Sequence, residues 1–199
     1  MTNSSYTNKP VEKWFEITNM LINTHPLSSK ELIEVTLQCW NDIFNSKIGS
    51  KPFSIGKDIL PSPQVMGFLL HELIPLELER RYPFKWRKDK TAHEKDLLYL
   101  PDDKFSIEIK TSSNKARVFG NRSYAQPTQA NKKSKSGYYL TINFGKFEDG
   151  AKELPKILLI RFGWLDHTDW RAQASASGQQ SSLSPDVYRY KLPIIYSIR

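Results

Sequence analysis

Two short runs of apolar and β-branched residues flank a Pro-Asp-Asp sequence in the middle of this 199-residue chain. The runs are 94–100 and 105–110, and residues 101–103 separate them. Because Pro and Asp favour tight turns, the pattern predicts a β-hairpin. Side chains alternate across a strand, so Ile107 and Ile109 share an apolar face. Glu108 and Lys110 then share the opposite, charged face, and the rest of the chain is organised around this hairpin.

A third charged residue, Asp96, lies on the first strand of the predicted hairpin. If residues 102–104 form a three-residue loop, Asp96 lies across from Lys110 and diagonal to Glu108. A four-residue loop would turn Asp96 to the other face, unless a bulge restores it. Two carboxylates and a lysine suit Mg²⁺ and phosphodiester hydrolysis, with Lys110 orienting a water or stabilising charge. A solvated charged hairpin has the same pattern, so the spacing alone does not identify a catalytic site.

The length and the composition set the limits of the fold. With 39% hydrophobic residues, a chain of 199 residues can bury one good core. We therefore expect a single domain spanning 1–199. Residues 1–81 form its mainly helical part, and residues 84–199 form the part that contains the sheet.

The net charge of +8 is concentrated in one segment. Residues 109–147 contain eight Lys and Arg and no Asp or Glu, whereas the rest of the chain has equal numbers of acids and bases. Solubility needs no such clustering, so the segment favours a surface that binds a polyanion.

Cys39 is the only cysteine of the chain. This excludes a disulfide framework and a cysteine-rich zinc site, and it fits a reducing cytoplasm. The polar N-terminus has no signal-peptide pattern, and no apolar stretch is long enough to span a membrane. We expect a soluble, cytoplasmic protein with no membrane partner.

Three helices are predicted before residue 82. The first covers 11–23, and the second begins at a capping box formed by Ser28 and Glu31. The third begins at Ser62-Pro63, an N-cap followed by a first-turn proline. Pro75 is expected to interrupt this third helix.

Glu72 is the ambiguous acid of the third helix. Helical spacing places it on a stripe with three apolar residues, which are Val65, Leu69 and Leu76. A carboxylate at such a place needs a partner. A nearby cation such as Arg80 could be that partner. His71, the preceding residue, is expected to be structural or exposed.

The segment 111–126 is dense in side chains of the kinds that contact DNA. Asn121, Arg122 and Gln126 are candidates for base readout, while Lys115 and Arg117 suit the phosphate backbone. A phosphate clamp is expected at Lys132–Lys135. A flexible basic loop remains the alternative. The full set of predicted DNA contacts is Ser113, Asn114, Lys115, Arg117, Asn121, Arg122, Ser123, Tyr124, Gln126, Lys132, Lys133 and Lys135.

Further strands are predicted after the basic segment, at 137–144 and 156–164, with a closing strand within 187–198. With a first strand at 84–87 and the hairpin, they give an α/β fold. The Ser-, Gln- and Ala-rich stretch 173–185 is expected to be a mobile surface loop. His167 and Asp169 could be drawn into a serine-hydrolase triad, but no G-x-S-x-G sequence supports it.

The combination of Asp96 with Glu108-Ile109-Lys110 resembles the PD-(D/E)xK motif of restriction-like nucleases, with Lys95 in place of the usual Pro. Longer segments are similar to the ScaI-type type II restriction endonucleases. These segments are 106–113, 119–126, 136–144 and 161–170. The likeness covers most of the chain from about residue 84, and the first eighty residues carry less of it.

This resemblance implies a restriction-endonuclease-like α/β core, in which helices flank a central mixed β-sheet. It implies that Asp96, Glu108 and Lys110 are catalytic. The two carboxylates and the main-chain carbonyl of Ile109 would bind Mg²⁺, for which Mn²⁺ can substitute. The resemblance also places Glu72 in the metal site, and it makes the loop 166–170 a second DNA-contacting loop.

The activity implied by the resemblance is that of a type II restriction endonuclease. Such an enzyme hydrolyses both strands of duplex DNA within a short palindrome and acts as a homodimer. A DNA methyltransferase is its functional counterpart, and the ScaI type suggests a six-base site cut to blunt ends. The dimer contact is expected on the N-terminal helices, around Trp14, Phe15 and Trp40, which could equally be core.

Two other functions stay open at this point. One is a structure-specific or repair nuclease on the same core. The other is a DNA-binding module with a vestigial nuclease centre, which would usually have lost one of the three catalytic residues.

Overall fold

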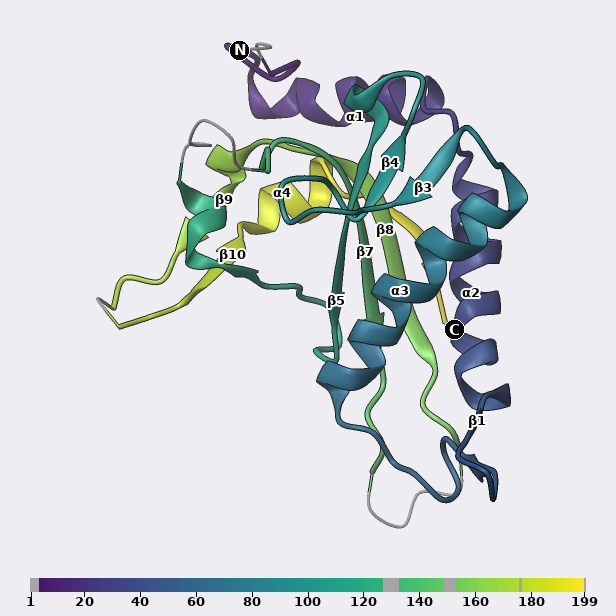
Figure 1. Ribbon diagram of the computed structural model, residues 1–199. Helices are drawn as coiled ribbons and strands as arrows, with labels where there is room; N and C mark the ends of the chain where they lie inside the picture. The colour runs from purple at the N-terminus through teal and green to yellow at the C-terminus, as the bar shows by residue number, and fades with distance from the viewer. Residues whose placement is uncertain (1–3, 127–132, 149–152, 176, 199) are drawn as a thin grey trace.

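The computed structural model describes residues 4–126, 133–148, 153–175 and 177–198. Its centre is a six-stranded mixed β-sheet, and N-terminal helices pack along it (Figure 1). This confirms the predicted α/β class with a central mixed sheet and helices before it. No helix of the described ranges is long and apolar enough to cross a membrane.

The helices follow the predicted order. The longer helices are α1 (Trp14–Asn23), α2 (Ser29–Asn45), α3 (Pro63–Arg81) and α4 (Pro185–Tyr190). Short 3-10 turns are η1 (Val11–Lys13), η2 (Asp103–Phe105), η3 (Arg122–Ala125) and η4 (His167–Asp169). The predicted capping box is present, because the Ser28 side chain accepts from the Glu31 N–H and the Glu31 side chain accepts from the Ser28 N–H.

The main sheet has the strand order β11-β8-β7-β5-β4-β3, and only β5 and β7 pair in parallel. Its strands are β3 (Trp86–Lys88), β4 (Leu97–Tyr99), β5 (Ile107–Ser112), β7 (Gly137–Phe144), β8 (Ile157–Leu165) and β11 (Ile194–Ser197). A second sheet has the order β6-β10-β9 and consists of β6 (Gly120–Asn121), β9 (Trp170–Ala172) and β10 (Gln180–Leu183). A small hairpin joins β1 (Lys47–Ile48) to β2 (Phe53–Ser54).

Apolar clusters cover both faces of the main sheet. On one face, α2 and α3 pack Val35, Trp40 and Leu70 against sheet residues such as Ile109. On the other face, Tyr139 packs against Trp170, with residues of η3, β10 and α4 around them. Because β5 is covered on both sides, a charged residue on it must find partners inside the protein.

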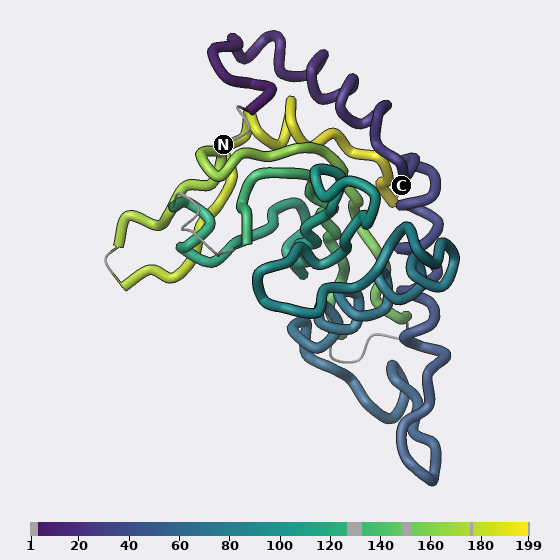
Figure 2. The backbone as a smooth tube through the Cα atoms, turned by 45° about the horizontal axis from the view of Figure 1, so that its top comes forward, coloured from purple at the N-terminus to yellow at the C-terminus, as the bar shows by residue number. Residues whose placement is uncertain are grey.

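The second sheet extends away from the main one. The connection between β9 and β10 forms an arm that projects to the left in Figure 1, and the tube in Figure 2 shows the same projection. The prediction of a mobile surface loop at 173–185 is therefore wrong for its second half, where β10 forms. Ser181 is buried and its hydroxyl donates to the Asn121 carbonyl, so a small polar residue can serve as an inward-facing strand residue.

Two local predictions are wrong: the register of the hairpin, and the interruption of helix α3 at Pro75. Leu97 pairs with Ile107, which places Asp96 beside Glu108 rather than across from Lys110. The turn is longer than three residues because η2 is built into it. In α3, Pro75 does not end the helix, since it is buried in the core and packing there offsets the lost hydrogen bond.

Candidate active site

The three predicted catalytic residues lie together at β4 and β5. Asp96 precedes β4, and its Oδ2 accepts a 2.7 Å hydrogen bond from the Ile109 N–H. Glu108 is 2% exposed, and its Oε1 lies 2.7 Å from the Lys110 ammonium. The short strand pairing thus fixes both carboxylates and the lysine relative to one backbone segment.

Lys133 is the unexpected member of this cluster. Its ammonium lies 2.8 Å from Asp96 Oδ1 and 2.6 Å from Glu108 Oε2. Sequence analysis placed Lys133 in a phosphate clamp, and nothing in its local pattern indicated contact with the acids. A single cation between two carboxylates occupies the position that a divalent ion would need.

Electrostatics keep this cluster ionised. Burial opposes ionisation of Asp96, but the nearby His71 ring and the charges of Lys110 and Lys133 hold its pKa well below the usual range. Burial likewise opposes ionisation of Glu108, and the charges of Lys110 and Lys133 lower its pKa nonetheless. The pKa of Lys110 is raised, because its attraction to Glu108 and Asp96 exceeds the effect of burial.

Lys95 is a buried lysine beside the cluster. Burial lowers the pKa of Lys95 to about 8, while the charge of Glu108 acts in the opposite direction. Its ammonium donates to the Ser134 carbonyl over 3.1 Å. Because Lys95 directly precedes Asp96, this bond holds the segment before β7 close to the acid. Gly137 has a φ of +141°, and a Cβ there would lie 2.8 Å from Lys95 Cε. This contact needs a glycine at position 137.

Helix α3 brings His71 to the acids. The helix lies so close to β5 that a Cβ on Gly67 would be 2.6 Å from Thr111 Oγ1. One turn later, His71 Nδ1 lies 3.6 Å from Asp96 Oδ2. His71 is therefore part of the site, although sequence analysis assigned it a structural or exposed role. The only available signal was its place beside Glu72 on a helix expected to reach the metal site.

Glu72 has a different partner. Its carboxylate pairs with the Lys88 ammonium on β3, at the margin of the site, and not with Arg80. The predicted apolar stripe is displaced, because Val65 and Leu76 are about half exposed while Met66 and Leu70 are buried. In the described part of the chain, no three His, Cys, Asp or Glu side chains meet closely enough to hold a metal ion. Glu72 as a metal ligand stays a prediction.

The donor set nevertheless fits a small hard cation. Asp96 and Glu108 provide carboxylate oxygens, and the Ile109 carbonyl faces the cluster, since Lys110 donates to it over 3.2 Å. Glu108 Oε2 is buried, and its charge partner is the Lys133 ammonium 2.6 Å away. Mg²⁺ prefers a few carboxylates with several waters, and a carboxylate pair that shares a single ammonium can accept such an ion when the ammonium moves away.

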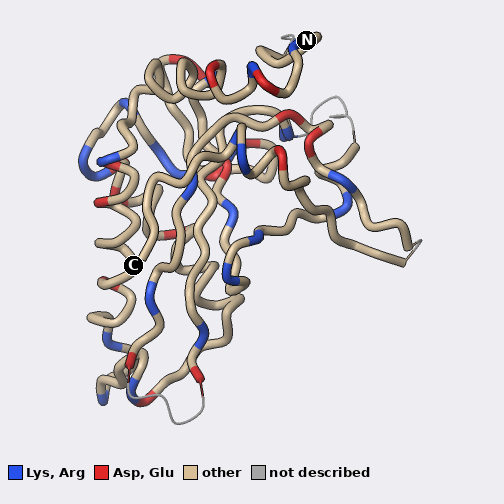
Figure 3. Tube along the Cα trace, turned by 180° about the vertical axis from the view of Figure 1, so that it is seen from behind, with Lys and Arg blue, Asp and Glu red and all other residues tan. Residues whose placement is uncertain are grey.

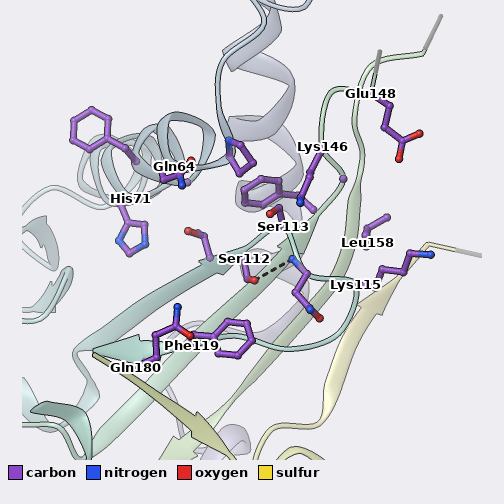
Figure 4. Close-up of a pocket in the computed structure, with 17 residues that line it drawn as sticks. Gln64, His71, Ser112, Ser113, Lys115, Phe119, Lys146, Glu148, Leu158 and Gln180 are labelled. Atoms are coloured by element: carbon purple, nitrogen blue, oxygen red, sulfur yellow. Dashed lines mark hydrogen bonds between the residues drawn. The ribbon is translucent and has the colours of Figure 1, made fainter. Parts of the chain in front are cut away.

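A groove of about 1170 Å³ opens beside the cluster. Gln64, Phe68 and His71 of α3 line one wall, and the segment that leaves β5 lines the other (Figure 4). The predicted DNA contacts Ser113, Asn114 and Lys115 lie in this second wall, together with Phe119 and Gln180. Sequence analysis missed Gln64 and Gln180, because each lies outside the basic segment.

The other predicted DNA contacts are distributed unevenly. Figure 3 shows Lys and Arg positions along the segment from β5 to η3. Asn114 Oδ1 accepts from the N–H groups of Ala116 and Arg117, which shapes the loop after β5. Arg122 Nη1 donates to the Ser175 and Gly178 carbonyls, so it holds the arm between β9 and β10. Six of the predicted contacts are exposed: Asn114, Lys115, Arg117, Asn121, Ser123 and Gln126.

Tyr124 does not have the exposed position that its predicted role as a DNA contact requires. It is buried, and its hydroxyl donates to Glu108 Oε1. Lys135 lies over the Tyr124 ring, 4.3 Å from the centroid. Lys132 lies outside the described residues.

The loop before β9 forms a local network of its own. The Ser136 hydroxyl donates to Asp166 Oδ1, and the His167 ring lies 2.9 Å from the same oxygen. Asp169 binds Lys191. Ser136 is therefore hydrogen-bonded to the acid and not to the imidazole ring, which differs from the relay of a serine hydrolase.

Two acids beside lysines, next to a groove lined by basic and amide side chains, are typical of a phosphodiester hydrolase. Comparisons with known proteins identify the kind of phosphodiester hydrolase. Residues 4–196 match the ScaI restriction endonuclease family. The type II restriction enzyme ScaI of Streptomyces caespitosus is 50% identical over 197 residues, which are 98% of this chain and 86% of that protein. No solved structure gives a significant match.

The chain therefore belongs to the ScaI restriction endonuclease family. It is a type II restriction endonuclease, a deoxyribonuclease that cleaves DNA at a specific site.

Proposed function

We propose that Asp96, Glu108 and Lys110 form the catalytic centre of a Mg²⁺-dependent endonuclease that hydrolyses both strands of duplex DNA within a short palindrome. The observation that carries this proposal is the convergence of the three residues in a buried, ionised cluster beside the groove. The chain acts as one restriction-endonuclease-like domain, and Mn²⁺ can substitute for Mg²⁺.

The metal would be held by the carboxylates of Asp96 and Glu108 and by the Ile109 carbonyl. When bound, Mg²⁺ polarises the phosphate and activates a water. Asp96 is held in place by the Ile109 N–H. Lys110 remains protonated, because the acids raise its pKa, and it can stabilise the charge that develops on the phosphate.

Lys133 has to leave the carboxylates when a divalent cation binds, because the two cations would repel each other at the same oxygens. Lys133 belongs to the basic segment, and its released ammonium can contact a phosphate at the mouth of the groove. This would reconcile its observed position with the predicted phosphate clamp.

The exposed residues of the basic segment would bind DNA. Lys115 and Arg117 suit the phosphate backbone, while Asn121 and Gln126 suit adenine edges. Gln180 joins them, since it is the β-ladder partner of Asn121 in the second sheet. Two amides side by side on a projecting strand pair offer a base-reading surface.

A homodimer follows from the reaction. One centre serves one phosphodiester, whereas a palindrome presents two strands related by a twofold axis. Of the residues expected at the contact, Trp40 is buried in the core and is excluded. Phe15 and Met20 of α1 are about half exposed, so this helix remains the proposed surface.

A plasmid digest with and without Mg²⁺ tests the proposal. We expect discrete fragments that depend on Mg²⁺, with no cleavage by Asp96→Asn under the same conditions. Sequencing of the fragment ends then gives the site and the cut position, and methylation of that site should protect the plasmid, as expected of a methyltransferase counterpart. Indiscriminate degradation would favour the repair nuclease. No cleavage by the wild type would favour a vestigial centre, against which the complete triad argues.

A further inference from the structure

Tyr124 is a buried residue of η3 that reaches the catalytic carboxylate. It is 6% exposed, and its hydroxyl donates to Glu108 Oε1. Its ring packs edge-on against Trp170, with 5.3 Å between the centroids. A Cβ on Gly120 would be 3.1 Å from Tyr124 Cγ, so the backbone also confines the ring. The phenol has little freedom to turn away from Glu108.

The two oxygens of Glu108 have different surroundings. Oε1 accepts from the Tyr124 hydroxyl and from Lys110, whose ammonium is 2.7 Å away. Oε2 pairs with the Lys133 ammonium, which is 2.6 Å away and also lies 2.8 Å from Asp96 Oδ1. The carboxylate is thus anchored through one oxygen, and the other is presented to the cation position.

The Tyr124 ring also contacts the catalytic lysine. The Lys110 ammonium lies 4.6 Å from the ring centroid and 2.7 Å from Glu108 Oε1. An ammonium at this distance is attracted to an aromatic face. Tyr124 therefore touches the acid through its hydroxyl and the lysine through its ring.

The hydroxyl remains a donor in this setting. A neutral phenol has one O–H to give, and Glu108 Oε1 receives it.

We infer that Tyr124 is a positioning residue that fixes the Glu108 carboxylate and the Lys110 ammonium, so that Oε2 faces the metal position. This inference rests on the proposed function. It gives the segment from Asn121 to Gln126 a second task, because the turn that carries candidate base contacts also holds the catalytic acid. Residues that orient a metal ligand commonly change metal affinity or activity by about 10- to 100-fold when they are removed.

Titration calorimetry of Mn²⁺ into the DNA-free protein tests this role. Tyr124→Phe keeps the ring and removes only the hydroxyl. We expect its Mn²⁺ affinity to fall by about tenfold or more. On plasmid DNA, kcat should fall while KM stays within about twofold of the wild type, as expected when substrate binding is intact.

Tyr138→Phe is the matched control. Tyr138 is also buried, and its hydroxyl donates to the Leu21 carbonyl over 3.0 Å, on the face of the sheet covered by α2 and α3. Loss of this hydroxyl should leave Mn²⁺ affinity and kcat unchanged. Thermal unfolding of both variants shows whether each is folded to the same extent.

The outcomes separate the positioning role from the proposed function. Unchanged Mn²⁺ affinity and kcat in Tyr124→Phe would overturn the positioning role and leave the nuclease proposal intact. Weaker Mn²⁺ binding by Tyr124→Phe, in a protein that cuts no DNA, would support the positioning role and refute the nuclease proposal. A wild-type protein that binds no Mn²⁺ would remove the metal site on which both depend.

Discussion

Two buried ionic clusters of this protein differ in how completely their charges are paired. Lys191 lies 2.7 and 2.9 Å from the two carboxylate oxygens of Asp169, and the Asp166 N–H donates to one of them. The rings of Tyr6 and Trp14 flank the Lys191 ammonium at 4.1 and 4.2 Å. One acid and one base thus satisfy each other in a closed pair.

The cluster around Asp96 and Glu108 is open by comparison. Two carboxylates share the field of three lysines, which are Lys95, Lys110 and Lys133. Asp96 and Glu108 share one ammonium, that of Lys133, and His71 connects the cluster to the groove. Burial of a charge alone therefore does not mark an active site. What marks it is a pair of acids that share one cation beside a groove.

Breaking the closed pair should have the largest effect on stability. Lys191→Met leaves Asp169 as a buried, unpaired charge, which typically costs about 3–5 kcal/mol of unfolding free energy. The double variant Asp169→Asn with Lys191→Met removes both charges and should recover most of this loss. Urea unfolding of the wild type, Lys191→Met and the double variant measures these changes in unfolding free energy. A loss below about 1 kcal/mol in Lys191→Met would show that the pair is not structural.

Removal of the lysine from the open cluster should instead affect the reaction. Lys110→Met should lower kcat by about 10²–10³-fold, as loss of a group that stabilises transition-state charge does. Its stability should change less than that of Lys191→Met, since Lys133 and Lys95 still neutralise the acids. Single-turnover cleavage is the measurement, with Lys156→Met as the control, because Lys156 is exposed and pairs with Glu153. Normal turnover by Lys110→Met would remove it from the mechanism.

Substitution of Lys133 should have a smaller effect than substitution of Lys110, and it should strengthen metal binding. If its ammonium competes with a divalent cation, Lys133→Met should raise the Mn²⁺ affinity of the DNA-free protein by about tenfold. Lys146→Met removes the same charge from another part of the groove wall and should have little effect. Weaker Mn²⁺ binding by Lys133→Met would mean that Lys133 supports the site rather than competing for it.

The sequence predicted the parts of the site that depend on local pattern. Alternation along one strand placed Glu108 and Lys110 together, and the turn signal brought Asp96 back towards them. The register was wrong by two residues, because η2 lengthens the turn and no local signal reveals it. Helix starts at Ser28 and Ser62 were likewise predictable, since the capping box at Ser28 and the first-turn Pro63 are local signals.

The contacts that sequence analysis missed are tertiary. Lys133 reaches the acids across 25 or more residues of chain, and Tyr124 turns inward from a segment that otherwise has the composition of a DNA-binding loop. His71 rather than Glu72 faces Asp96, because the close approach of Gly67 to Thr111 sets the rotation of α3. A helical pattern gives the spacing of residues but not which stripe meets the sheet.

Mn²⁺ binding by two matched variants distinguishes the open cluster from the closed pair as the metal centre. Glu108→Gln changes the acid of the open cluster, whereas Asp169→Asn with Lys191→Met neutralises the closed pair. The account predicts that Glu108→Gln loses Mn²⁺ affinity by more than about 100-fold, while the double variant binds Mn²⁺ as the wild type does. Wild-type affinity in Glu108→Gln would contradict the assignment of the open cluster as the metal centre.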